Sequence, residues 1–379
     1  MIISFQSWGL FPEKMKNFLK TISVACLMSI LATGSDGASD SAIADRLMKN
    51  YEPGDPEDPV NVKIGIYIHH FYAVSEQSMD YSLSMYLRQA WRDKQLTFDP
   101  EDGKDDFKMP DSLIHSVWKP DLFFRNEKEA SVHTVTVPNR LMKINSTGHV
   151  WYVTKVSATL SCPMQLQKYP FDTQSCPIMF ESFGYTMDTI ILEWLNSSIE
   201  YHKTLRLPDF TLKDVILHNC SQNYTAGTFP CLATRFMLKR DVGFYILQIY
   251  LPSIMIMCIS WLTFWFSVKD VAARTALGLT TLLTSVLLSA WSRYQLPKVS
   301  YATAMDIWNT VCFLFIAMAL LEFVLVQFLS RGESDESEET GELKKRLNKI
   351  KDSGDKICRI AFPVAFLLFL IIYFAIYAP

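Results

Sequence analysis

The sequence lacks the patterns typical of nucleic-acid binding, metal binding and catalysis. Its formal net charge is only −3 and no long basic run is interleaved with aromatic residues, so we expect no nucleic-acid partner. It contains no Cys-x-x-Cys pair, which argues against a zinc site, and we expect neither a metal nor a cofactor. No Ser-His-Asp, paired-carboxylate or metal-ligand constellation stands out, so we expect no enzyme.

Apolar residues are abundant instead. Of all residues 49% are hydrophobic and 13% aromatic, which is more than one soluble domain normally needs. Four apolar stretches follow Arg240, namely Val242–Phe266, Ala273–Ala290, Thr303–Leu329 and Cys358–Tyr377. Each approaches the roughly 20 residues that a bilayer-crossing helix requires. We therefore expect a four-helix transmembrane bundle in contact with membrane lipid.

The start of the chain has the layout of a secretory signal peptide. Lys14, Lys16 and Lys20 precede an apolar stretch too short to span a bilayer, and small residues follow it. Removal of this segment leaves the new amino terminus outside the cell. We expect a signal peptide at 1–34, an extracellular domain at 35–241, three membrane helices within 242–329, a short cytoplasmic loop at 330–356, and at 357–379 the fourth helix with an extracellular carboxyl terminus.

The expected cytoplasmic loop carries two further signals. Its basic residues within 344–351 agree with the rule that positive charge stays inside the cell. Leu343, Leu347, Ile350 and Ile357 recur at helical spacing, so the loop is expected to end in a helix continuous with the fourth span.

Between Asn61 and Arg240 the sequence alternates short β-type runs with turn signals. The runs are "VKIGIYIHHFYAV", "YSLSMYLRQAW", "SVHTVTV", "RLMKI" and "HVWYVTKVSATL". Many short strands at this spacing predict an all-β, immunoglobulin-like sandwich. Glycosylation sequons fall in the same region, at Asn145, Asn196, Asn219 and Asn223.

Four cysteines precede the first long apolar stretch and would face an oxidising compartment. They are Cys162, Cys176, Cys220 and Cys231. Four cysteines allow three pairings. The short separations favour Cys162–Cys176 and Cys220–Cys231, each closing a small loop.

The second apolar stretch differs from the others because it mixes hydroxyl residues with apolar ones. Reading every third or fourth residue gives one face of Ala276, Thr280, Leu283, Leu287, Ala290 and Tyr294. Small and hydroxyl residues broken by leucines suit a water-filled pore that closes by dewetting. Leu283 is the first candidate for the constriction, and Leu287 is the second.

The alternative is a packing helix whose hydroxyls bond back to carbonyls one turn earlier. The pattern alone does not separate the two. Arg274 at the inner end and Arg293 at the outer end favour the pore, since positive rings at its mouths attract anions. No Asp or Glu stands next to Arg274 on its membrane side.

A family resemblance rests on several motifs. "CPMQLQKYPFDTQSC" resembles the signature loop of Cys-loop receptors, which are pentameric ligand-gated ion channels. "WKPDLFFRNEK", "ESFGYTMD", "CSQNYTAGTFPC" and "LPKVSYATAMDIW" are similar to the branch of glycine-, GABA- and glutamate-gated chloride channels. "AARTALGLTT" matches the start of the anion-channel pore helix, with Ala272 where many relatives have proline. The likeness covers nearly everything from Tyr51 to Tyr377.

The resemblance implies a homo- or heteropentamer in the plasma membrane, of the kind found at synapses, that conducts chloride when a neurotransmitter binds between neighbouring ectodomains. The cytoplasmic loop is shorter than in most relatives, which argues against synaptic scaffolding. On the principal face the implied agonist-binding residues are Glu181, Ser182, Phe183, Tyr185, Tyr224 and Phe229. On the complementary face they are Tyr86 and Arg88, whose guanidinium would grip an agonist carboxylate.

Two departures leave the agonist open among glycine, GABA, glutamate and another amine. Val153 and Ala226 stand where relatives carry hydroxyl residues that touch the ligand. The same family also contains the alternatives of gating by protons, metal or another amine, and of a modulatory subunit. Outside it, the alternative is a membrane-anchored binding module that makes no pore.

The resemblance also implies a coupling site where the extracellular domain meets the membrane. Its expected residues are Glu76 and Asp172 from the extracellular side with Arg240 and Lys298. Opposite charges there could change spacing between closed and open states.

Overall fold

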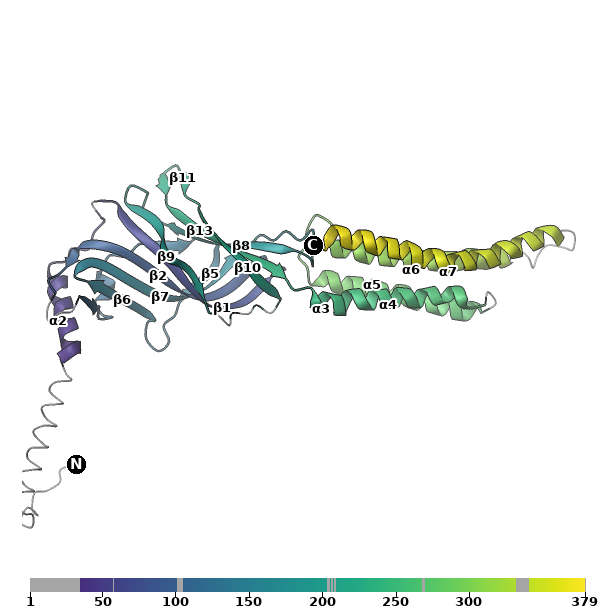
Figure 1. The fold of residues 1–379 in the computed structure, drawn as a ribbon, viewed down its shortest axis with the longest axis horizontal. Helices are drawn as coiled ribbons and strands as arrows, with labels where there is room; N and C mark the ends of the chain where they lie inside the picture. The colour runs from purple at the N-terminus through teal and green to yellow at the C-terminus, as the bar shows by residue number, and fades with distance from the viewer. Residues whose placement is uncertain are drawn as a thin grey trace, which may run out of the picture.

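The structure is a computed structural model, and it describes residues 35–56, 58–100, 105–202, 205, 207, 209–267, 270–331 and 341–378. The expected signal peptide at 1–34 lies outside this range. The described chain has two parts, a β-sandwich at one end and a bundle of long helices at the other (Figure 1).

The larger sheet of the sandwich has seven strands. They are β1 (Val60–Ser75), β2 (Asp80–Thr97), β3 (Asp106–Lys108), β5 (Glu127–Val132), β6 (Arg140–Asn145), β7 (Thr147–Ser161) and β9 (Ile190–Tyr201). Their order is β3-β6-β7-β2-β1-β9, and β5 pairs with β7. All neighbours are antiparallel except β1 and β9, which run parallel.

The smaller sheet has four strands in the order β10-β13-β8-β4. They are β10 (Phe210–Asn219), β13 (Cys231–Arg240), β8 (Thr173–Ser182) and β4 (Leu122–Phe124). A separate hairpin consists of β11 (Gln222–Tyr224) and β12 (Gly227–Phe229). Outside the sheets, α2 (Ser35–Lys49) packs at the amino-terminal end, and η2 (Ile114–Ser116) is a single turn.

The core lies between the two sheets because apolar residues alternate along the strands. On β2, for example, Tyr81, Leu83 and Met85 are fully buried. The expected sandwich is confirmed, with one exception in "SVHTVTV". There β5 ends at Val132, and Val135 is 78% exposed. The chain turns back at this point, since Asn139 N–H donates to the His133 carbonyl.

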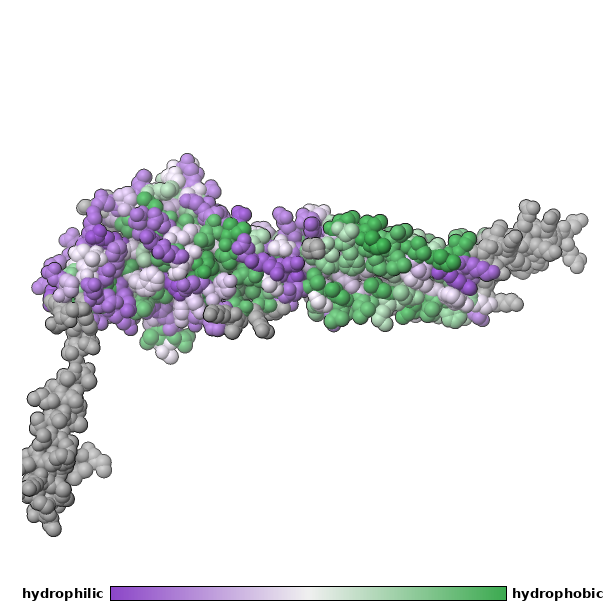
Figure 2. Space-filling model, in the orientation of Figure 1, coloured by the Kyte–Doolittle hydropathy of each residue, from purple (hydrophilic) through white to green (hydrophobic). Residues whose placement is uncertain are grey.

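Four helices are long and apolar enough to cross a membrane: Gly243–Trp265, Val271–Tyr294, Ala304–Phe328 and Gly354–Tyr377. Figure 2 shows the change from the mixed, largely hydrophilic surface of the sandwich to an almost wholly hydrophobic surface over these helices. The chain is therefore a multi-pass membrane protein, as the apolar stretches predicted.

The first crossing is a broken helix. It contains α3 (Gly243–Tyr245), the π-helical turn η3 (Ile246–Tyr250), α4 (Leu251–Trp261) and the 3-10 turn η4 (Leu262–Trp265). The π-helical turn ends two residues before Pro252, whose missing N–H interrupts the hydrogen-bond ladder.

The other crossings are continuous helices. They are α5 (Val271–Tyr294), α6 (Ala304–Arg331) and α7 (Gly341–Tyr377). The expected continuity of the fourth span with a helix in the preceding loop is confirmed, because α7 runs unbroken from residue 341.

Candidate functional site

An exposed aromatic cluster surrounds the β11–β12 hairpin. The Tyr224 and Phe229 rings lie 5.7 Å apart, and Tyr224 is 48% exposed. Phe183, just after β8, is 78% exposed, and its ring packs edge-on against Phe123. Met187 N–H donates to the Thr228 carbonyl at 2.8 Å, which ties this loop to the hairpin. Aromatic faces held in this way can bind a cation.

Two disulfides constrain the sandwich, and both are the expected pairs. Cys220–Cys231 closes the base of the hairpin, with the Cα atoms 4.8 Å apart. Cys162–Cys176 joins the end of β7 to β8. Of the sequons, Asn196, Asn219 and Asn223 are exposed and Asn145 is half-buried, and their glycosylation stays a prediction.

Three other residues expected on the principal face support the loop from inside. The Tyr185 hydroxyl donates to Asp55 at 2.8 Å and accepts from Trp118 Nε1 at 3.2 Å. Burial raises the pKa of Tyr185, so its hydroxyl stays protonated.

Glu181 and Ser182 are both buried. Glu181 pairs with Arg125 at 3.3 Å, and the Ser182 hydroxyl donates to Asp121 at 2.6 Å. The Glu181 carboxylate therefore already has a cationic partner within the subunit, and its contact with an agonist stays a prediction. Glu181 and Ser182 directly precede the exposed Phe183.

The complementary residues lie on the larger sheet. Tyr86 is 37% exposed, with the His69 ring edge-on at 4.2 Å. Arg88 Nη1 donates to Glu200 on β9 at 2.7 Å. Sequence reasoning missed His69 and Glu200, and Glu200 meets Arg88 only through the parallel pairing of β1 with β9.

The two aromatic sets belong to different sheets. Within the described part of the chain, no hydrogen bond, ion pair or ring contact joins Tyr224 or Phe229 to Tyr86 or Arg88. The two sets are therefore separate within one chain. We call the first the principal half-site and the second the complementary half-site, after the faces on which the resemblance expects them, and their meeting between neighbouring copies stays a prediction.

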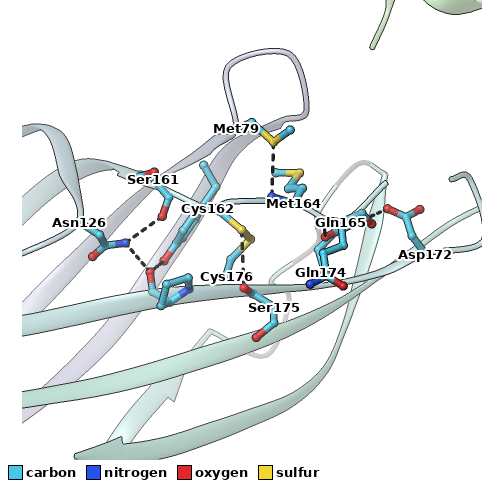
Figure 3. The surroundings of a disulfide bond; sticks show 12 residues. Met79, Asn126, Ser161, Cys162, Met164, Gln165, Asp172, Gln174, Ser175 and Cys176 are labelled. Carbon is cyan, nitrogen blue, oxygen red and sulfur yellow. Dashed lines mark hydrogen bonds between the residues drawn. A yellow bond between two sulfur atoms is a disulfide. The ribbon is translucent and has the colours of Figure 1, made fainter. Parts of the chain in front are cut away.

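The loop closed by Cys162–Cys176 reaches the helices. Figure 3 shows the disulfide, with the Gln174 amide spanning the loop. The Gln174 side chain accepts from Gln165 N–H and donates to the Gln165 carbonyl, at 3.0 and 2.8 Å. Farther along the loop, Gln167 accepts from Ala304 N–H at the start of α6, at 2.9 Å. The loop therefore connects the sandwich to the bundle.

Arg240, at the end of β13, is buried beside this loop. It binds both oxygens of Asp172, at 2.7 and 3.0 Å, and also Glu76. Its guanidinium lies over the Tyr169 ring at 4.7 Å. Three of the four expected coupling residues, the buried Arg240 and Asp172 and the half-buried Glu76, thus form one cluster. Lys298 is exposed, and among the described residues no ion pair joins it to this cluster.

Comparison with known families accounts for both parts of the chain. The family model for the neurotransmitter-gated ion-channel ligand binding domain matches residues 40–242. The chain belongs to the neurotransmitter-gated ion channels. The model for the neurotransmitter-gated ion-channel transmembrane region also matches, over residues 249–353. The protein is therefore a subunit of a ligand-gated, multimeric channel, and its family is one of channels rather than of enzymes.

In this channel subunit α5 has two distinct faces. The residues predicted to line the pore are exposed: Ala276, Thr280, Leu283, Leu287, Ala290 and Tyr294. The opposite face is buried against the rest of the bundle, where a Cβ on Gly278 would come within 2.6 Å of Leu320 Cδ1. The small residue at position 278 lets α5 and α6 approach closely.

The hydroxyls of α5 bond back along the helix. Thr280 Oγ1 donates to the Ala276 carbonyl, and Thr284 Oγ1 to the Thr280 carbonyl, each at 2.7 Å. This satisfies the donors, as the packing interpretation predicted, but leaves the oxygen lone pairs on the exposed face. Back-bonding and a wet surface are therefore compatible.

Arg274 departs from the expected charged ring at the inner mouth. Its side chain is fully buried, and Nη2 pairs with Asp355 of α7 at 2.8 Å. Its Nε also donates to the Phe266 carbonyl at 3.2 Å. A cation in the bundle needs such partners, so the guanidinium turns away from the exposed face. Ala272, next to it, is exposed. Arg293 at the outer end is 65% exposed and pairs with Asp306.

Proposed function

We propose that the chain is a subunit of a chloride channel that opens when a small amine-bearing neurotransmitter binds between the ectodomains of neighbouring subunits. The observation that carries the proposal is the two-faced α5. Its buried face packs within the subunit, and its exposed face offers small residues, hydroxyl oxygens and the leucines Leu283 and Leu287. Five such faces around an axis would enclose a hydrated conduit with a leucine constriction.

The choice of chloride follows from the charges along α5. Between Val271 and Tyr294 the sequence contains no Asp or Glu, so this helix can build no carboxylate ring. Arg293 presents its guanidinium near the outer end. Both arginines pair with an aspartate, but the Arg293 side chain is 65% exposed whereas that of Arg274 is 0% exposed. We therefore assign anion attraction to the outer mouth and to the helix dipoles rather than to an inner arginine ring.

A chain of contacts links the half-sites to the helices and would transmit agonist binding to the pore. An agonist bound between a principal and a complementary half-site would favour one position of the β11–β12 hairpin over another. The hairpin continues into β13, which ends at Arg240. Arg240 joins Asp172 in the disulfide loop, and that loop bonds the start of α6.

The test is current from cells that express this chain alone. Glycine, GABA, glutamate, histamine and acid would be applied in turn, and external chloride then replaced by a large anion. We expect one of the ligands to open a conductance whose reversal potential follows the chloride gradient. A reversal potential that follows sodium instead would overturn the chloride assignment.

A second experiment addresses the pore itself. Ala276→Glu would place a carboxylate on the exposed face of α5, and we expect it to move the reversal potential away from that of chloride. Unchanged selectivity would favour a binding module whose own helices line no conduit.

A further inference from the structure

We propose that the carboxylate of Glu200 occupies the guanidinium of Arg88 in place of a ligand carboxylate. The complementary half-site would then bind a cationic amine that has no carboxylate. This rests on the proposed function, because it names the ligand class of the same site. The ion pair joins Arg88 Nη1 to Glu200 Oε2 at 2.7 Å.

The sheet register explains why these side chains meet. Tyr67 on β1 pairs with Tyr86 on one side and with Glu200 on the other. Arg88 lies two residues beyond Tyr86 on β2, opposite Gly65, which has no side chain to obstruct it. The guanidinium therefore crosses β1 diagonally to reach β9, and its Cζ atom lies 5.4 Å from the centre of the Tyr67 ring.

Glu200 is placed to compete with a ligand carboxylate for the Arg88 guanidinium. The Arg88 side chain is 18% exposed and that of Glu200 is 41% exposed. A carboxylate fixed on the neighbouring strand acts at a far higher effective concentration than a free one. A ligand carboxylate would have to displace Glu200 or share the guanidinium with it.

The residues around Arg88 offer a ligand carboxylate few other hydrogen-bond donors. Val153 faces Arg88 across the β2–β7 pairing and supplies no hydroxyl. Beside the pair, the half-buried Tyr67 ring and the exposed Tyr86 ring lie 6.3 Å apart. Because Arg88 already lies over Tyr67, the Tyr86 ring is the one that would attract a further cation. Neutral rings beside a partly exposed carboxylate suit an ammonium group.

A second cation near the half-site could bind a ligand carboxylate in place of Arg88, so its role has to be tested. Lys155 on β7 lies directly opposite Tyr86 and is half-buried. If its ammonium bound ligand carboxylates, the half-site would accept amino acids despite Glu200.

The experiment measures binding to the purified full-length receptor in lipid nanodiscs by calorimetry. The probes are two pairs that differ by a carboxylate, histamine with histidine and tyramine with tyrosine. In at least one pair we expect the amine to bind at least tenfold more tightly than its amino acid. Glu200→Gln should free Arg88 and reduce that ratio at least tenfold, and Glu200→Asp should give an intermediate ratio.

Glu193→Gln is the matched control, since Glu193 is an exposed glutamate on the same strand, and it should leave the ratio unchanged. Four results would overturn the proposal: tighter binding of the amino acid in both pairs, a ratio insensitive to Glu200→Gln, amino-acid binding abolished by Lys155→Gln, or no binding by any probe. Chloride currents recorded in parallel keep the two hypotheses apart. Selective amine binding without any current would refute the proposed function and leave this inference standing.

Discussion

Arg240 and Lys143 both pair with carboxylates, but only Arg240 does so out of contact with water. The Arg240 side chain is 0% exposed, whereas Lys143 and its partner Asp106 are 49% and 59% exposed. A buried ion with several partners cannot lose one without leaving the others uncompensated. An exposed pair is solvated whether or not it forms.

Replacing each cation by glutamine should therefore have unequal effects. Arg240→Gln leaves Asp172 and Glu76 without a cation, and we expect a loss of about 3–5 kcal/mol of stability. Lys143→Gln should cost less than about 1 kcal/mol. Thermal unfolding of the purified receptor, with surface labelling of expressing cells, measures both. Equal shifts for the two variants would contradict the buried role of Arg240.

Motif matching decided which site residues the sequence could predict. Arg240, Asp172 and Glu76 were placed together by matched motifs, and the structure brings them together. Glu200 and Asp355 were missed, because they lie outside the matched motifs and no sequence pattern links them to their arginines. No local periodicity encodes which strand lies beside β1 or which turn of α7 lies beside α5.

At the scale of elements, α5 follows the helical periodicity of its sequence closely. Every residue of the stripe predicted from every third or fourth residue is exposed, and the intervening hydroxyls Thr281 and Ser285 are buried. The alternation in "SVHTVTV" predicted a strand over the whole run, but the strand ends at Val132. β-branched residues favour strands only where a partner strand continues, and the pairing of β5 with β7 ends at Val132.

Cysteine substitution along α5 tests its two faces. In activated receptors we expect cysteines at Thr280, Leu283 and Leu287 to react with a water-soluble thiol reagent. Cysteines at Thr281 and Ser285, which face the bundle, should react at least tenfold more slowly. The unsubstituted chain controls for its own free thiols at Cys258, Cys312 and Cys358. Fast reaction on the buried face, or none on the exposed face, would mean that α5 does not line a wet pore.

The β11–β12 hairpin depends on a single glycine. Gly227 has φ +133°, and a Cβ there would come within 2.9 Å of Thr186 Cγ2. Gly227→Ala should strain the hairpin by about 1–3 kcal/mol and shift the agonist concentration-response curve at least fivefold to higher concentration. Adding Thr186→Ser removes the methyl group and should recover part of the shift. A curve unchanged by Gly227→Ala would show that the hairpin geometry does not govern agonist affinity.

At the scale of the whole molecule, the two proposed half-sites lie at different places in each subunit. The principal cluster follows the smaller sheet and its hairpin, and the complementary cluster lies on β1, β2 and β9 of the larger sheet. In a closed ring of subunits, a heterologous interface would bring every principal half next to a complementary half.

Complementation between two defective subunits tests the ring directly. Tyr224→Ala removes a ring from the principal half, and Tyr86→Ala removes one from the complementary half, so each variant alone should respond weakly to the most effective ligand of the panel above. When the two are expressed together in equal amounts, a random ring keeps both halves intact at about one quarter of its interfaces, because each half is intact with a probability of one half. We expect current to return through these interfaces. Co-expressed subunits that remain as silent as either variant alone, at matched surface levels, would place the binding site within one subunit.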